Sequence, residues 1–220
     1  MPFPNNLTAI DRLTRSDHGY LTANDECLFL GEYTARGGFA HSDTNQLIFN
    51  LKKPMNRRGR PEWRYKNLAI RTAARAFRNA INDQILRTAT FVPIPPSKAK
   101  GHPEYDNRMT KLIMTIDNAN PVDCRELIIQ SESTPAAHES EIRPAPDELE
   151  DRYAMNPNLI EPRPTYLILI DDVLTTGSHF RAAKQILLQV FPDVPIVGYF
   201  VARRVPETLD IEAFFDDLGS

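Results

Sequence analysis

The chain is poor in cysteine and has no long apolar runs. Its 220 residues include two cysteines, Cys27 and Cys124, which lack the paired spacing of a zinc site or a disulfide framework. No apolar stretch approaches the length of a membrane span, and no cationic stretch leads into an apolar run near Met1. We therefore expect a cytoplasmic protein in a reducing compartment, with no signal peptide and no membrane contact.

Positive charge is concentrated in the middle of the chain. Between Lys52 and Lys111 there are 15 Lys/Arg against 4 Asp/Glu, whereas from Leu112 to the end there are 8 against 19. The basic segment Lys52 to Arg78 is expected to meet an anionic partner, which could be a polyphosphate, a nucleic acid or the acidic remainder of the same chain. A solvated basic helix face paired within the fold is the alternative.

Apolar patterning predicts a single α/β domain. Strands are expected at 27–33, 88–93, 127–130, 166–170 and 195–201, and helices at 65–87, 106–116 and 180–190. Asn45 to Leu51 forms a second apolar segment near the N-terminus. Strands that alternate with helices indicate a doubly wound, mostly parallel sheet.

We divide residues 1–220 of this domain into three parts and one long loop. N-terminal strands and a hood or extension occupy 1–64, the α/β core 65–203 and a tail 204–220, with terminal segments forming a small hood. Ser131 to Pro164 holds six of the eighteen prolines and is expected to be a long loop with one helical turn near 147–153. Such a loop is either a lid or disordered, and we favour the lid.

The most informative segment runs from Tyr166 to His179. Tyr166 to Ile170 is continuously apolar, as in a strand buried on both faces, and Asp171, Asp172 and the small-residue run Thr175 to Ser178 follow it. Successive N–H groups in such a turn can cradle phosphate at a helix N-terminus, while adjacent carboxylates can accept hydrogen bonds from sugar hydroxyls. The pattern therefore predicts a ribose phosphate site; an acidic strand end beside an ordinary helix cap is the alternative.

This order of residue types resembles the motif for 5-phosphoribosyl-1-pyrophosphate (PRPP) of type I phosphoribosyltransferases. Outside the motif, Tyr33, Leu47-Ile48, Leu51-Lys52 and the Val-Pro-x-Pro run from Val92 resemble the ComF-type branch of that family. The resemblance implies that Asp171 and Asp172 contact the ribose hydroxyls and take part in catalysis. It further implies that the 5-phosphate is held by the loop residues Thr175, Thr176, Gly177, Ser178 and His179.

A second segment, Val92 to Lys98, resembles the pyrophosphate loop of the same family. Ser97 could donate to pyrophosphate, and Lys98, with Lys100 or Arg108, could neutralise it. A cis peptide preceding Pro95 or Pro96 would match the unusual peptide common in this loop. A proline-rich structural turn is the alternative.

The sequence departs from the family pattern in three places. The cysteine cluster that often precedes ComF-type domains is missing, which puts any zinc-dependent or DNA-uptake role in doubt. His179 stands where another Thr or Ser is usual, and it could contact phosphate or face solvent. Thr175 stands where six-oxopurine enzymes carry an Asp, and because a Thr cannot accept a proton near neutral pH, six-oxopurine salvage is a poor guess.

The resemblance implies transfer of a 5-phosphoribosyl group to an unidentified nitrogenous acceptor with release of pyrophosphate. Mg²⁺ would be held mainly by PRPP and water, with Asp171 or Asp172 as a potential ligand. His138 and Arg143 are the lid's candidate contacts to pyrophosphate within Ser131 to Asp151. Tyr199, Phe200 and Arg203 are unranked candidates to meet the acceptor, while Trp63, Phe214 and Phe215 are expected to pack within the fold or in a homodimer interface.

Two alternative functions remain open. The first is a non-catalytic PRPP or nucleotide sensor that acts on a protein or nucleic-acid partner through the basic segment Lys52 to Arg78. The second is a phosphatase of the haloacid type, which also ends a strand in Asp. That class spaces its two carboxylates two residues apart so that they face the same way, whereas Asp171 and Asp172 are adjacent and are expected to diverge.

Overall fold

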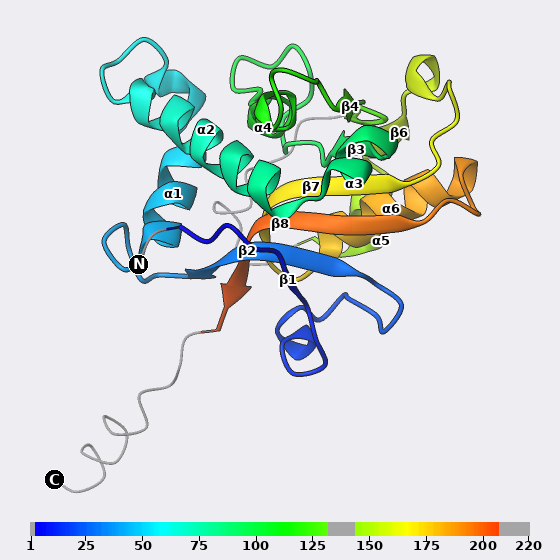
Figure 1. The fold of residues 1–220 in the computed structure, drawn as a ribbon, viewed down its shortest axis with the longest axis horizontal. Coiled ribbons are helices and arrows are strands. Elements are labelled where there is room, and N and C mark those ends of the chain that lie inside the picture. The colour runs from blue at the N-terminus through cyan, green and yellow to red at the C-terminus, as the bar shows by residue number, and fades with distance from the viewer. Residues whose placement is uncertain (1–2, 132–143, 207–220) are drawn as a thin grey trace, which may run out of the picture.

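The computed structural model describes residues 3–131 and 144–206, and a six-stranded sheet lies at its centre (Figure 1). The strands lie in the order β1-β2-β8-β7-β3-β4, and every neighbouring pair except β1 with β2 is parallel. Their bounds are β1 Thr8–Ala9, β2 Cys27–Thr34, β3 Thr90–Pro93, β4 Asp123–Cys124, β7 Leu167–Leu174 and β8 Ile196–Val205. The protein is therefore an α/β protein with a mostly parallel sheet.

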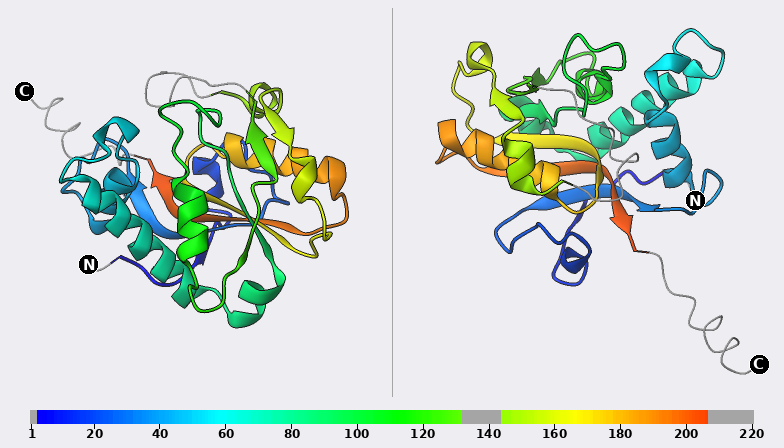
Figure 2. Two further views of the ribbon diagram at one scale, coloured as in Figure 1. Left: turned by 90° about the horizontal axis from the view of Figure 1, so that it is seen from above. Right: turned by 180° about the vertical axis from the view of Figure 1, so that it is seen from behind.

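Helices cover both faces of this sheet. On one face pack α1 (Asp43–Leu51), α2 (Trp63–Ala80) and α4 (Arg108–Thr115), and on the other packs α6 (Ser178–Val190). A separate two-stranded sheet of β5 (Ile128–Gln130) and β6 (Tyr153–Met155) accompanies α5 (Pro146–Glu150) beside α6, as both views of Figure 2 show. The remaining elements are α3 (Asp83–Thr88) and three 3-10 turns, η1 (Arg15–Asp17), η2 (Met55–Arg57) and η3 (Pro157–Leu159).

Alternating side chains of the central strands build two cores. In β7, Ile168 and Ile170 pack with α1, α2 and α4, whereas Leu167 and Leu169 pack with α6. All four are fully buried, which explains why this strand is continuously apolar. The same alternation sends the adjacent residues Asp171 and Asp172 toward opposite faces of the sheet.

The sheet has a topological switch point between β3 and β7. The chain leaves β3 through α4 on one face and continues to β4, whereas it leaves β7 through α6 on the other face and continues to β8. Ligands of open α/β sheets bind where neighbouring strands lead away in opposite directions, beyond their carboxyl ends. The loops after Pro93 and after Leu174 both leave from that edge.

Several sequence predictions needed correction. Asn45 to Leu51 is part of helix α1, because Ser42 caps it by accepting a hydrogen bond from Asn45 N at 3.0 Å. The helix expected over 65–87 is two helices, since Ile81 is extended and the Asn82 side chain starts α3 by accepting from Ile85 N at 2.9 Å.

The long loop and the hood also differ from expectation. Within 131–164 the described residues form α5, β6 and η3, and α5 lies close to the helical turn expected near 147–153. Leu149 of α5 and Tyr153 of β6 are buried against α6, which a simple loop would not achieve. The N-terminal segment does not stand apart as a hood: β1 and β2 extend the main sheet, and β8 continues past residue 203 to Val205. Within the described residues, no helix is long and apolar enough to cross a membrane.

Candidate functional site

The turn between β7 and α6 presents unpaired backbone donors. Thr175, Thr176, Gly177 and Ser178 direct their N–H groups at no acceptor within residues 3–131 and 144–206. Gly177 adopts φ 86°, a left-handed conformation that favours glycine, and α6 begins at the next residue. Four consecutive free donors at a helix N-terminus form a concentrated positive end suited to an anion.

A segment from the N-terminal part of the chain fixes the orientation of this turn. Thr175 O accepts a hydrogen bond from His18 Nδ1, and Thr176 O accepts one from Tyr20 N at 2.9 Å. In a trans peptide the C=O and the following N–H point in opposite directions, so the N–H groups of Thr176 and Gly177 point away from this segment. Both carbonyls are thereby removed from the side on which an anion would approach.

His18 is fully buried, and burial lowers the pKa of its imidazole. The neutral ring therefore donates its Nδ1 proton to Thr175 O, while Nε2 is buried without a partner in the described part of the chain. Leu21 completes the contact, since a Cβ placed on Gly177 would lie 2.8 Å from Leu21 Cδ2. These contacts tie residues 18–21 to the turn.

The hydroxyl and imidazole side chains of the turn have partners of their own. Thr176 Oγ1 donates to Ser178 Oγ at 3.2 Å, and Ser178 is buried. His179 Nδ1 lies 2.8 Å from the hydroxyl of Tyr153 in β6, which links the turn to the small sheet. His179 is thus half-buried and hydrogen-bonded to Tyr153, and its predicted phosphate contact stays a prediction.

Asp171 and Asp172 differ sharply in their surroundings. The side chain of Asp172 is 4% exposed, and its oxygens bind two cations: Oδ1 lies 3.0 Å from Lys52 Nζ, and Oδ2 accepts from Arg108 Nε at 2.8 Å. Burial opposes its ionisation, but the charges of Arg108 and Lys52 hold the pKa of Asp172 below its ordinary value. Asp172 is thus a paired carboxylate.

Asp171 is half-buried, and its Oδ1 accepts a hydrogen bond from Asp172 N at 2.7 Å. Burial, followed by the negative charge of Asp172, raises the pKa of Asp171 to about 7. With Thr175, Gly177 and His179 it lines a pocket of about 200 Å³. Asp171 is therefore the carboxyl that faces the space beside the turn.

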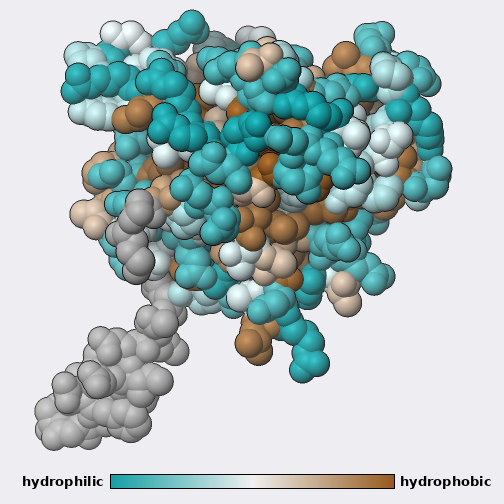
Figure 3. Space-filling view, in the orientation of Figure 1, coloured by the Kyte–Doolittle hydropathy of each residue, from teal (hydrophilic) through white to brown (hydrophobic). Residues whose placement is uncertain are grey.

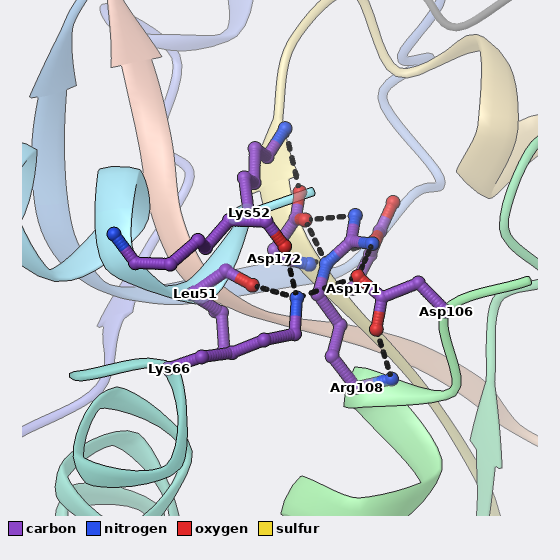
Figure 4. A network of polar contacts seen from close by, with 8 residues as sticks. Leu51, Lys52, Lys66, Asp106, Arg108, Asp171 and Asp172 are labelled. Atoms are coloured by element: carbon purple, nitrogen blue, oxygen red, sulfur yellow. Dashed lines mark hydrogen bonds and ion pairs between the residues drawn. The ribbon is translucent and has the colours of Figure 1, made fainter. Parts of the chain in front are cut away.

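The cations around Asp172 form part of a larger network, which joins four elements (Figure 4). Arg108 Nη1 also binds Asp106 at 3.0 Å, and Asp106 binds Lys66 Nζ at 2.7 Å. Lys66 is 2% exposed and donates to the carbonyls of Leu51 and Lys53 at the end of α1. We call these side chains the Asp172 network: Lys52, Lys66, Asp106, Arg108 and Asp172.

The Asp172 network carries three cations against two paired carboxylates. Burial lowers the pKa of Lys66, and Asp106 opposes that shift. Burial acts likewise on Arg108, but Asp172 and Asp106 raise the pKa of its guanidinium above the ordinary value. The raised pKa of Asp171 lessens the negative charge that this third carboxyl adds beside the network.

The loop predicted to hold pyrophosphate leaves β3 directly beside these residues, because Ile94 N donates to Ile170 O at 2.9 Å. Lys98 forms no ion pair within the described residues, whereas Lys100 is paired with Glu126. The described chain has its cis peptide at Glu161–Pro162, so the bonds before Pro95 and Pro96 are trans and that expectation is wrong.

A pocket of about 480 Å³ lies against this loop. Pro95, Pro96, Asp106, Arg108 and Glu126 contribute to its lining. Helix α4 does not begin with Asp106 as its cap; Asn107 takes that position, and Asp106 Oδ1 accepts from Arg108 N at 3.2 Å. Arg108 thus reaches Asp172 from the first residue of α4.

The remaining candidates lie elsewhere or outside the described residues. Tyr199 stacks on Phe77 in the core, and Arg203 binds Asp17 and Glu32, so neither is open to an acceptor. Phe200 lines the smaller pocket beside Phe180. His138, Arg143, Phe214 and Phe215 fall in the ranges 132–143 and 207–220, which the structure does not describe.

Sequence reasoning missed His18, Lys66 and Tyr153. Lys66 had a detectable signal, because it lies four residues before Ile70 on the apolar stripe of α2. His18 and Tyr153 had none, since each meets the turn from a remote part of the chain. No protein-family model matches this chain, and a search of the curated proteins found no match.

Proposed function

We propose that this protein binds PRPP at the switch point and transfers its phosphoribosyl group to a nitrogenous acceptor, releasing pyrophosphate. The observation that carries the proposal is the turn at Thr175 to Ser178, whose four N–H groups have no acceptor among the described residues and lie beside the Asp171 carboxyl. A phosphate takes the donors, and a sugar hydroxyl donates to the carboxylate. One ligand that carries both groups a few bonds apart is a ribose 5-phosphate.

The second phosphate-bearing end of PRPP would meet the loop after β3. Lys98 is a cation without an ion pair in the described chain, and Arg108 is held rigidly between Asp106 and Asp172. Cations that are already oriented lose little entropy on binding, so they stabilise a leaving pyrophosphate efficiently. In this proposal the turn after β7 therefore binds the ribose 5-phosphate, and the loop after β3 binds the pyrophosphate.

The donor set fits a Mg²⁺ ion that is held mainly by the ligand. Asp171 offers a carboxylate, while no group of three or more His, Cys, Asp or Glu gathers in the described part of the chain. A hard divalent cation needs about six oxygen ligands, so diphosphate and water must supply the others. When bound, the ion offsets the negative charge that develops on the leaving pyrophosphate.

PRPP binding is measured by isothermal titration calorimetry in the presence of Mg²⁺. The wild-type protein should bind PRPP, and Asp171→Asn with Asp172→Asn should abolish binding. Asp193→Asn is the control, since Asp193 is an exposed carboxylate paired with Arg163 on the surface. Equal PRPP affinity in the double variant and the control would refute the assignment.

A regulatory module that binds PRPP without turnover is the second candidate. This candidate is favoured because both carboxylate oxygens of Asp172 are bound by cations, Lys52 and Arg108, so Asp172 is not available to a ligand. An enzyme releases pyrophosphate when candidate amines and bases are supplied, and a sensor binds PRPP and leaves it intact. A coupled pyrophosphate assay on the wild-type protein separates the two.

A further inference from the structure

A strongly basic surface lies beside the candidate site and has no role in it. Residues 52–75 contain nine Lys/Arg and one acid, Glu62. Only Lys52 and Lys66 belong to the Asp172 network, so seven of the nine remain: Lys53, Arg57, Arg58, Arg60, Arg64, Arg71 and Arg75. In Figure 3 the corner over the loop before α2, at the upper left as in Figure 1, is predominantly hydrophilic.

Most of these cations have no ion-pair partner in the part of the chain that the structure describes. Arg58, Arg60, Arg71 and Arg75 are exposed, and they form no ion pair with any residue in 3–131 or 144–206. Arg57 has a long contact of 3.9 Å with Glu62. These four arginines are therefore solvated, and among the described residues the internal pairing that the sequence offered as the alternative is not formed by them.

The exposed cations of α2 lie along one line. Arg64, Leu68, Arg71 and Arg75 follow the spacing i, i+4, i+7 and i+11, which places them on a single stripe of the helix. The buried stripe of the same helix runs through Ile70, Ala73 and Phe77. At about 1.5 Å per residue, Arg64 and Arg75 are about 16 Å apart along the axis. A linear polyanion matches this arrangement better than a compact phosphate does.

Aromatic side chains stand exposed among these charges. Phe49 is 58% exposed and Tyr65 is 42% exposed. Lys53 Nζ lies 5.4 Å from the ring centre of Phe49, and the guanidinium of Arg64 lies 4.9 Å from that of Tyr65. Phe39 adds an edge-on contact to Phe49 at 5.3 Å. Lys66 Nζ donates to Lys53 O, so the end of α1, which carries Phe49, packs against the first turn of α2, which carries Tyr65.

From this combination we propose that the surface binds single-stranded nucleic acid. We call it the basic face: Phe39, Phe49, Lys53, Arg57, Arg58, Arg60, Arg64, Tyr65, Leu68, Arg71 and Arg75. Phosphates pair with the cations, and unstacked bases stack on the exposed rings. A duplex keeps its bases inside the stack and uses only the charges. An acidic protein would likewise use the charges but would have no planar bases to stack on Phe49 and Tyr65.

Binding is tested by fluorescence anisotropy with a labelled oligothymidylate of about 20 nucleotides, with a duplex of equal length and with poly-glutamate as competitor. Arg64→Glu with Arg71→Glu and Arg75→Glu should weaken single-strand binding by at least tenfold. It should also make the salt slope shallower by about 2, since about 0.7 is lost per phosphate contact. The control variant is Arg12→Glu with Arg152→Glu and Arg163→Glu. It changes the net charge of the protein by the same amount, but at positions outside the basic face, so it should leave binding unchanged.

The aromatic part of the proposal has its own variants. Phe49→Ala and Tyr65→Ala should each weaken binding of the single strand about tenfold and leave binding of the duplex unchanged. Because both side chains are largely exposed, the variants should fold, which circular dichroism checks. Equal loss in the two triple variants, tighter binding of the duplex, or displacement by poly-glutamate at equal charge would each overturn the proposal. None of these measurements uses PRPP, so the outcome is independent of the proposed function.

Discussion

His18 hydrogen-bonds through Nδ1 to the carbonyl oxygen of Thr175, 157 residues further along the chain. This contact holds the Thr175 carbonyl away from the side of the turn that an anion would approach. Because the peptide is planar, it also points the N–H of Thr176 toward that side. We predict that His18→Ala weakens binding of ribose 5-phosphate about fivefold, as expected from losing one hydrogen bond of about 1 kcal/mol. Calorimetry on folded protein measures this affinity.

His18→Asn is the matched control for that prediction, since its amide nitrogen stands near the place of Nδ1. It should recover most of the affinity if orientation of the turn is the role of His18. A variant His18→Ala that stays folded and binds ribose 5-phosphate like the wild type would contradict this role.

Gly177 should tolerate no side chain, for two separable reasons. Its φ of 86° strains any L residue, and an added Cβ would meet Leu21 at 2.8 Å. Gly59 has nearly the same φ, 85°, with nothing within 4 Å, so Gly59→Ala measures the backbone cost alone. We expect Gly177→Ala to lower the free energy of unfolding by about 1–2 kcal/mol more than Gly59→Ala does in urea titrations. Equal losses would mean that Leu21 does not press on the turn.

The carboxyl of Asp171 should make stability depend on pH. Its pKa is raised to about 7 in the folded protein from an ordinary value of 3.8, so the folded state binds more protons between these values. Stability therefore falls as pH rises from about 4 through 7. Asp171→Asn should stabilise the protein by about 1–2 kcal/mol at pH 8 and by nearly nothing at pH 4, as partial exposure screens the charge.

Chemical denaturation of wild type and Asp171→Asn at both pH values measures that difference. A stabilisation that is the same at pH 4 and pH 8 would show that the effect does not come from ionisation of Asp171.

The pairing of Arg108 with Asp172 should dominate the local energetics. Arg108→Ala leaves a buried carboxylate with Lys52 as its remaining partner and should lower the free energy of unfolding by about 3 kcal/mol. In Arg108→Ala with Asp172→Asn the buried charge is gone, so the loss should be smaller than the sum of the single losses. A double-mutant cycle by urea unfolding gives the coupling energy, and additive losses would contradict the pairing.

Local patterns predicted those parts of the fold whose signal is contained in a short segment. A continuous apolar run predicted the strand over 166–170, and helical spacing predicted the helix over 180–190. Both are present, but β7 continues to Leu174 and so includes Asp171 and Asp172, and α6 begins at Ser178. Asn45 to Leu51 was ambiguous because a short apolar run does not distinguish a strand from a buried helix. The break at Ile81 depends on a side-chain cap, which a periodic pattern does not reveal.

The sequence predicted the part of the site that is formed by consecutive residues, but not the contacts that remote segments make with it. Asp171, Asp172 and the turn at Thr175 to Ser178 are consecutive, so their order alone indicated an anion site. The sequence could not show that Asp172 forms ion pairs with Lys52 and Arg108, because these cations come from the end of α1 and from α4. Contacts between remote segments follow from packing, for which one sequence offers no local signal.

The central claim is that the N–H groups of Thr175 to Ser178 hold the phosphate of a ribose ligand. A ¹H–¹⁵N correlation spectrum recorded during titration with ribose 5-phosphate tests it most directly, since each amide reports separately. The account predicts that the amide resonances of Thr175, Thr176, Gly177 and Ser178 move in saturable fashion while those of Arg57 to Arg60 stay in place. Saturable shifts confined to the basic face, with the four turn amides unmoved, would contradict it.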